Sequence, residues 1–267
     1  MRRTSSSVGG RVVVPLLLAG ALLAACTSQT VIETRSVQDA SVVDARRRAE
    51  IHASLAGEYF RRGNLAVALE ETRLALKEDS SYVPAYNVRG LIYMELREDA
   101  QARLAFEEAL RRAPGDADVM NNFGWFLCLR GEPARGMEMF ARVQALPLYD
   151  TPEKPLLNAG LCSRLQGNSK EAEDYLRRAV AIRPDLIAAL FNLAEILHEK
   201  GNHKEAEIYL VRYMRLGEPT LAALVLGVRI ARGQGERAAA DSMLQQLRRR
   251  FPDAPQTREL VESVGKP

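Results

Sequence analysis

The feature that most constrains this chain is a bulky residue followed by a small one, a pair that recurs with a period of 34 residues. The pairs are Leu55-Ala56, Arg89-Gly90, Phe123-Gly124, Leu193-Ala194 and Leu226-Gly227. Small residues at regular spacing let two helices approach closely, and only 6% of the residues are aromatic. The chain is therefore predicted to be all-α and to repeat one helical hairpin about six times.

The pattern resembles the tetratricopeptide repeat (TPR), in which two antiparallel helices pack through small residues and proline ends the second helix. Thr151-Pro152 is a small insertion that shifts the register after the third repeat. The resemblance predicts a superhelical solenoid over residues 44–253 and a C-terminal tail over 254–267, with a short helix at Gln256–Val264. The repeats are expected at about 49–82, 83–116, 117–150, 153–186, 187–219 and 220–253.

The turns inside the hairpins are predicted where glycine precedes asparagine or glutamate. Glycine ends a helix readily because it adopts the left-handed conformation without steric cost. These positions are Gly63-Asn64, Gly131-Glu132, Gly167-Asn168, Gly201-Asn202 and Gly235-Glu236.

Residues 1–25 have the pattern of an export signal. Arginines near the start precede an apolar run, Val12–Ala25, that is too short for an ordinary membrane span. The run closes with Leu23-Ala24-Ala25-Cys26, which resembles the bacterial lipobox, where the cysteine becomes the acylated first residue. An ordinary secretory signal with an incidental cysteine is the alternative.

A lipid anchor at Cys26 has consequences for location. Stable attachment needs more than one acyl chain, and bacterial lipoproteins of this kind carry three. By resemblance to Gram-negative sorting rules, Thr27 directs the protein to the outer membrane, where it faces the periplasm. Residues 26–43 are polar and are expected to form the acylated N-terminus and a flexible tether.

The charge balance argues against a nucleic-acid partner. The formal net charge is +3, but Arg2, Arg3 and Arg11 lie in the predicted signal, and their removal leaves 34 basic and 34 acidic residues. A near-neutral mature chain lacks the basic excess of nucleic-acid-binding proteins.

The concave face of a TPR solenoid is lined by the first helix of each hairpin. In the early repeats, the positions that face this groove in the family are largely apolar, and Asn87 and Asn121 are expected to bond a peptide backbone. The alternative is that these apolar residues pack against a neighbouring repeat. A row of basic residues that would clamp a C-terminal carboxylate is absent. The predicted protein-binding groove comprises Phe60, Asn87, Leu91, Met94, Asn121, Trp125, Leu129, Leu157 and Leu161.

Cys128 and Cys162 lie on the first helices of adjacent repeats, which run side by side. Their Cα atoms are therefore expected within the roughly 4.4–6.8 Å that a disulfide requires. An exported protein meets an oxidising compartment, which favours a bond over the alternative of two buried thiols.

No catalytic or metal-binding motif is apparent. His198 and His203 are five residues apart across a predicted turn, which is not the spacing that places two metal ligands on one helical face. Phosphate-binding loops and nucleophile motifs are also lacking. We therefore expect a protein that is not an enzyme and that uses no cofactor, metal or small-molecule substrate.

The combination of lipobox, short tether and six repeats resembles the PilW/PilF family of type IV pilus biogenesis and stability lipoproteins. Its most specific element is Asn121–Cys128, with a weaker echo at Leu157–Cys162. The resemblance implies an outer-membrane pilotin whose early groove binds the pilus secretin and promotes its localisation and multimer assembly. It also implies the Cys128–Cys162 bond. A periplasmic scaffold for other cell-envelope or peptidoglycan machinery, or a carbohydrate-export adaptor, remains the alternative.

Overall fold

A computed structural model describes residues 41–262, which are helices joined by turns, without a strand. The predicted all-α TPR solenoid class is confirmed in these residues. The predicted signal peptide, Cys26 and most of the tether lie outside the described residues, as does the end of the tail after Glu262. The chain divides into two compact units, one up to Val88 and one from Arg89 onward, and each is described by itself.

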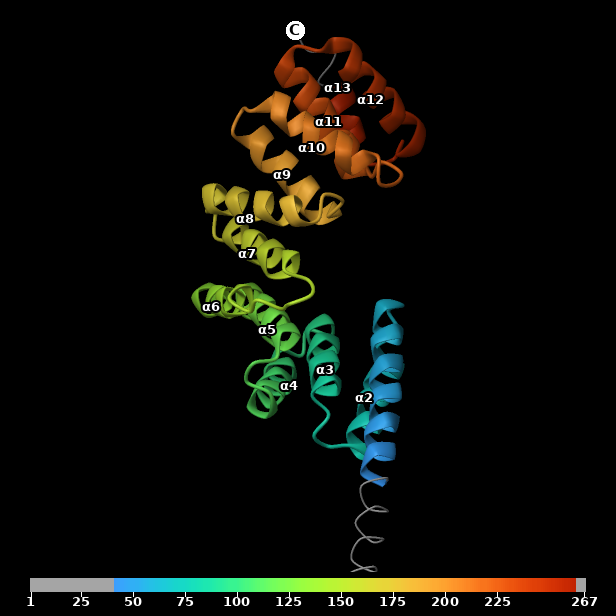
Figure 1. Cartoon of the computed structure of the whole chain (residues 1–267). Helices are drawn as coiled ribbons and strands as arrows, with labels where there is room; N and C mark the ends of the chain where they lie inside the picture. The colour runs from blue at the N-terminus through green and yellow to red at the C-terminus, as the bar shows by residue number, and fades with distance from the viewer. Residues whose placement is uncertain (1–40, 263–267) are drawn as a thin grey trace, which may run out of the picture. The chain divides into compact units, whose positions relative to one another are not determined.

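The first unit is a helical hairpin followed by the start of a third helix (Figure 1). Its helices cover residues 41–61, Leu65–Glu78 (α2) and the first part of Val83–Glu95 (α3). Three small side chains, Ala53, Ala75 and Ala85, form one of its buried clusters. Because alanine projects so little, the helices can approach closely.

The first helix corrects one predicted boundary. Residues 41–43, which we assigned to the tether, are helical. Adding residues to an existing helix costs little compared with starting one, so the helix of the first repeat extends upstream into this polar segment. Val42 and Val43 remain 66% and 64% exposed there.

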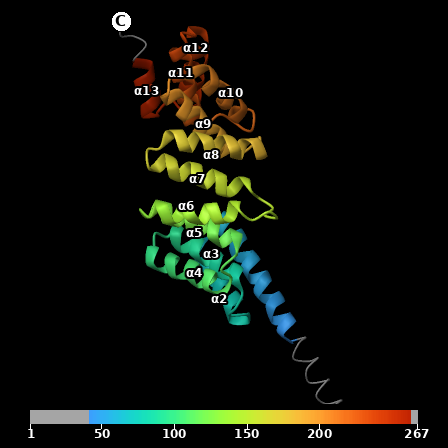
Figure 2. The same cartoon turned by 60° about the vertical axis from the view of Figure 1, so that its left-hand side comes forward.

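The second unit is a stack in which successive helices follow one another in chain order (Figure 1 and Figure 2). In addition, α5 contacts α7, α7 contacts α9, α9 contacts α11, and α11 contacts the last helix, α13. After the end of α3, its helices are α4 Asp99–Arg112, α5 Ala117–Leu129, α6 Pro133–Gln144, α7 Glu153–Leu165, α8 Ser169–Ile182, α9 Ile187–Glu199, α10 His203–Met214, α11 Leu221–Gln234, α12 Arg237–Arg250 and α13 Pro255–Glu262.

Glycine and a bulky partner close the hairpins of the second unit. A Cβ atom on Gly124 would meet the ring of Phe140 at 2.8 Å, and one on Gly160 would meet Leu176 at 2.7 Å. Both partner side chains are fully buried. In these two hairpins, the second helix therefore inserts a large, fully buried side chain at the small residue, as the repeat pattern predicts.

The five predicted glycine turns are present, with φ between 76° and 80°. In the second repeat, the same left-handed conformation is adopted by Arg97, at φ 59°. The surrounding hairpin imposes this conformation on a residue that disfavours it.

Candidate protein-binding sites

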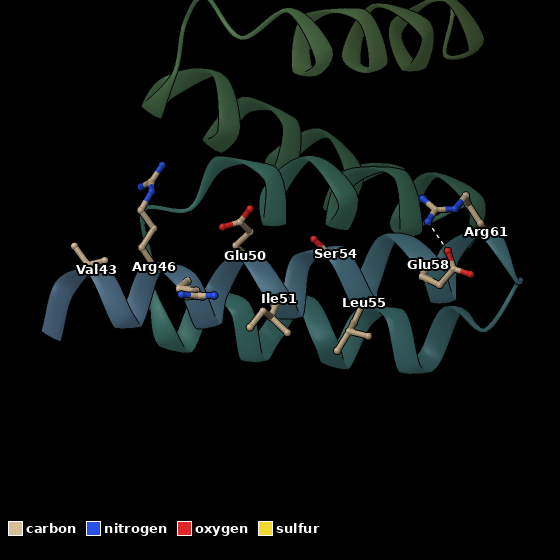
Figure 3. Close-up of a pocket in the computed structure, with 9 residues that line it drawn as sticks. Val43, Arg46, Glu50, Ile51, Ser54, Leu55, Glu58 and Arg61 are labelled. Carbon is tan, nitrogen blue, oxygen red and sulfur yellow. Dashed lines mark hydrogen bonds and ion pairs between the residues drawn. The ribbon is translucent and has the colours of Figure 1, made fainter. Parts of the chain in front are cut away.

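A hollow of about 950 Å³ lies along the exposed face of the first helix, and all its lining residues belong to the first unit (Figure 3). Its apolar side chains are Val43, Ile51 and Leu55, of which Ile51 is 52% exposed and Leu55 39% exposed. We call this surface the first-helix hollow. Its lining residues are Val43, Arg46, Arg47, Glu50, Ile51, Ser54, Leu55, Glu58 and Arg61.

The charged residues of the first-helix hollow are mostly paired. Arg46 lies 3.5 Å from Asp79, and Glu58 accepts hydrogen bonds from Arg61 and Arg62. These two bonds lower the pKa of Glu58, which keeps it ionised. Arg47 has no ion-pair or hydrogen-bond partner among the residues that the structure describes.

Sequence reasoning missed the first-helix hollow. Among its apolar residues, the repeat pattern names only Leu55, as the bulky residue before Ala56. The spacing of Val43, Ile51 and Leu55, which follow one another by eight and four residues, could have revealed a continuous apolar stripe.

The predicted groove residues are divided between the two units, so they are described separately. Phe60 and Asn87 belong to the first unit, where both are half-buried. The second unit contains six apolar residues from the first helices of its hairpins, which we call the A-helix stripe. They are Leu91, Met94, Trp125, Leu129, Leu157 and Leu161.

The A-helix stripe is less open than the first-helix hollow. Leu129 is 37% exposed, and the other five are half-buried. Trp125 packs against the core formed by Cys128, Phe140, Ala159 and Cys162, and Leu157 packs against another core cluster. These two residues therefore contribute to the packing between repeats and are also partly exposed at the surface.

Asn121 does not have the role predicted for it. It is 4% exposed, and its side-chain oxygen accepts a hydrogen bond of 3.0 Å from Asn158 on α7. A buried amide must be hydrogen-bonded, and the neighbouring repeat supplies the partner. Asn121 thus links two repeats and offers no exposed amide to a peptide.

The structure pairs Cys128 on α5 with Cys162 on α7. The sulfur atoms lie 2.00 Å apart and the Cα atoms 5.7 Å apart, within the predicted range. Formation of this bond in the exported protein stays a prediction.

A polar network joins the first helices of two later hairpins. Arg164 on α7 donates to Asn192 at 2.7 Å, to Glu195 at 2.7 Å and to Glu199 at 3.1 Å, all on α9. One arginine thus ties α7 to α9 at three points.

His198 and His203 are close together despite their five-residue spacing. Their Nδ1 atoms lie 3.1 Å apart, because the tight turn folds the start of α10 against the end of α9. Burial lowers the pKa of His198, and the charges of His203 and Arg229 lower it further, against a smaller opposing effect of Glu199. No group of three or more potential metal ligands occurs in residues 41–262.

Within the same range, no helix is long and apolar enough to cross a membrane.

Comparisons with known proteins identify the class first. Residues 53–117, 154–218 and 222–254 match the tetratricopeptide repeat family. The fold is thus that of a TPR protein, a class whose members typically bind protein partners and act as scaffolds.

Two relatives define the family more narrowly. A crystal structure of PilW, a widely conserved type IV pilus biogenesis factor, matches with a TM-score of 0.73 and 34% sequence identity, over 80% of this chain and 98% of PilW. The type IV pilus assembly protein PilF of Pseudomonas aeruginosa is 25% identical over 209 residues, which are 78% of this chain and 82% of PilF. A structure of PilF matches with a TM-score of 0.74 at 22% identity, over 82% of this chain and 99% of that one. The chain belongs to the PilW/PilF family of type IV pilus biogenesis TPR proteins.

Proposed function

We propose that this protein is a lipid-anchored pilotin of the outer membrane, which binds the type IV pilus secretin and promotes its localisation and multimer assembly. Membership of the PilW/PilF family supports a role in pilus biogenesis. The observation that carries the binding step is the first-helix hollow, because its exposed apolar residues Val43, Ile51 and Leu55 line one concave surface.

The first-helix hollow suits a short apolar segment with an acidic residue. Ile51 and Leu55 form its apolar part, and covering them contributes on the order of 1–2 kcal/mol each. Arg47 has no partner in the described residues and can pair with a carboxylate of the bound segment. The A-helix stripe is a second apolar surface for the same client.

The anchor at Cys26 keeps the bound secretin at the membrane. Three acyl chains hold the protein at the inner leaflet of the outer membrane. A secretin subunit captured by the tethered repeats therefore experiences a high effective concentration of other subunits at that membrane. Capture and tethering together favour multimer assembly without any catalytic step.

The test compares two double variants in cells that make pili. Ile51→Asp with Leu55→Asp places two charges in the first-helix hollow, and we expect heat-resistant secretin multimers to disappear from the outer membrane. Trp125→Ala with Leu91→Asp alters the A-helix stripe, and we expect partial loss. Immunoblotting of membrane fractions measures the multimers, and circular dichroism of the purified variants checks that the helices remain.

The matched control is Leu104→Asp with Ile208→Asp, because these residues are also exposed apolar side chains, at 62% and 58%, but lie outside both surfaces. This variant should keep its multimers. Full multimers in the hollow variant, together with their loss in the stripe variant, would move the secretin site to the A-helix stripe. Full multimers in both would reject secretin binding by these surfaces.

A further inference from the structure

Two histidines meet at the turn between α9 and α10. His198 lies in the last turn of α9, and His203 is the first residue of α10. Their Nδ1 atoms are 3.1 Å apart and their ring centroids 5.0 Å apart. The ring of His203 also packs against the backbone of α11, because a Cβ atom on Gly233 would lie only 2.5 Å from it. The His198–His203 pair therefore connects three helices.

This contact depends on the protonation of the two rings. A neutral imidazole has one nitrogen that donates a hydrogen bond and one that accepts, whereas both nitrogens of a charged imidazole donate. The hydrogen bond between the two Nδ1 atoms therefore requires that only one of them carries a hydrogen. It can form when both rings are neutral or when one is charged. When both rings are charged, the bond is lost and the rings repel each other.

The surroundings do not offset two added charges, because their own charges already cancel. Beside His198, Arg164 of α7 and Arg229 of α11 balance Glu195 and Glu199 of α9. The other charged residues around the turn balance in the same way: Lys200, Glu173, Arg177 and Glu205 form one network, and Lys204 and Glu207 on α10 have opposite signs. A doubly protonated pair therefore leaves an excess of positive charge at the turn.

The helix ends place this stress on the start of α10. A positive charge is favourable at the C-terminus of a helix and unfavourable at its N-terminus, so His198 tolerates a proton at the end of α9 better than His203 does at the start of α10. The side chain of Asn202, the N-cap residue, makes no capping hydrogen bond to α10. The first turn of α10 is therefore the part that gives way when both rings are charged.

The same conclusion follows from the proton balance of His198. Burial lowers its pKa, and the charges of His203 and Arg229 lower it further, against a smaller opposing effect of Glu199. A state in which this ring faces water takes up its proton at a higher pH than the closed state does. The closed state is therefore fully favoured only above the ordinary histidine pKa of about 6.5, and it loses stability as the pH falls below that value.

We propose that the His198–His203 pair is an acid-sensitive switch, which holds the first turn of α10 against α9 and α11 while at most one ring is charged and releases it when both are charged. Histidine is the side chain that ordinarily titrates between pH 5 and 8, so the switch responds to mild acid. It uses no residue of the first-helix hollow or of the A-helix stripe.

The test is hydrogen–deuterium exchange of the full-length protein in detergent, measured by mass spectrometry at pH 7.5 and pH 5.0. Protection factors remove the intrinsic effect of pH on exchange. In the first turn of α10 and the end of α11, we expect protection to fall by about tenfold or more at pH 5.0, because two adjacent unit charges repel by well over the thermal energy. Protection of α5 and α6, which contain no histidine, should stay the same.

Three variants assign the effect to the pair. His203→Gln and His198→Gln each leave a polar side chain that does not titrate, so in both the ratio of protection between the two pH values should approach one. This ratio remains informative even if a variant is less protected at both pH values. His52→Gln is the matched control, since the remaining histidine of the chain lies on the first helix beside Glu71, and it should keep the full effect.

A second measurement follows the rings directly. With isotope-labelled histidine, NMR records the titration of His198, which should move to higher pH in His203→Gln because a positive neighbour has been removed. An unchanged titration, equal protection of α10 at the two pH values, or the same loss of protection in His203→Gln would overturn the proposal. The secretin multimers are measured at neutral pH and through other residues, so the two proposals fail separately.

Discussion

Gly136 shows at the residue scale how little space the hairpins leave. A Cβ atom there would lie 2.5 Å from the sulfur of Cys128 and 2.6 Å from the carbonyl oxygen of Gly124. The oxygen belongs to a helix backbone and cannot move aside without displacing α5. A single added methyl group would therefore push α5 and α6 apart.

We predict that Gly136→Ala lowers the free energy of unfolding by about 1–3 kcal/mol, the usual cost of overpacking a core. Gly57→Ala is the matched control, since its Cβ would have only the end of Arg61 near it, at 3.7 Å. The control should be neutral or stabilise by up to about 1 kcal/mol, because alanine favours helices over glycine. Urea denaturation followed by circular dichroism measures both, and a Gly136→Ala protein as stable as the wild type would contradict the prediction.

The hydrogen bond between Asn121 and Asn158 could not be predicted from the repeat pattern. The repeat pattern places Asn121 at a position that faces the groove, and the side chain does start from the expected helix. Its 3.0 Å hydrogen bond to the next repeat forms because Asn158 occupies the facing position on α7. Contacts between repeats are set by pairs of residues, which a one-repeat pattern does not describe.

At the scale of elements, the Cys128–Cys162 pair joins two helices from adjacent hairpins. Sequential TPR hairpins are otherwise held by packing, because each hairpin contacts mainly its neighbours. A covalent link between α5 and α7 would fasten the second unit at one hairpin junction, where Trp125 also packs.

We predict that maleimide labelling of the unfolded mature protein rises only after reduction, because the bond blocks both thiols. Replacing both cysteines by serine should lower the free energy of unfolding by roughly 3–4 kcal/mol, as expected for a closed loop of about 34 residues. Mass spectrometry counts the labels and urea denaturation measures the stability. Equal labelling with and without reductant would show that the pair stays reduced.

The turns illustrate what local sequence conveys about an element. Glycines predicted five of the hairpin turns, because only glycine adopts positive φ without cost. Arg97 gave no such signal. There, the packing of the hairpin decides the backbone conformation, and the sequence shows it only through the period of the repeat.

For the whole molecule, the proposed function depends on joining the folded repeats to a membrane. In the proposal, the predicted acylation of Cys26 provides this attachment.

We predict that Cys26→Ser releases the protein from the membrane fraction and leaves its helical circular dichroism unchanged. Outer-membrane secretin multimers should fall strongly, because capture no longer concentrates subunits at the membrane. Sedimentation of cell envelopes, with immunoblotting for both proteins, provides the measurement. Retention of the Cys26→Ser protein in the membrane fraction would show that another contact anchors it.

The sequence by itself determined the helical hairpins, most of their turns and the approach of Cys128 to Cys162. These features follow from period, residue size and backbone freedom, which act locally and repeat along the chain. Only the tertiary structure decided that Asn121 is buried, that His198 meets His203, and that Val43, Ile51 and Leu55 line an exposed hollow. Those outcomes depend on which side chains face one another across helices, and on which helix face is left uncovered.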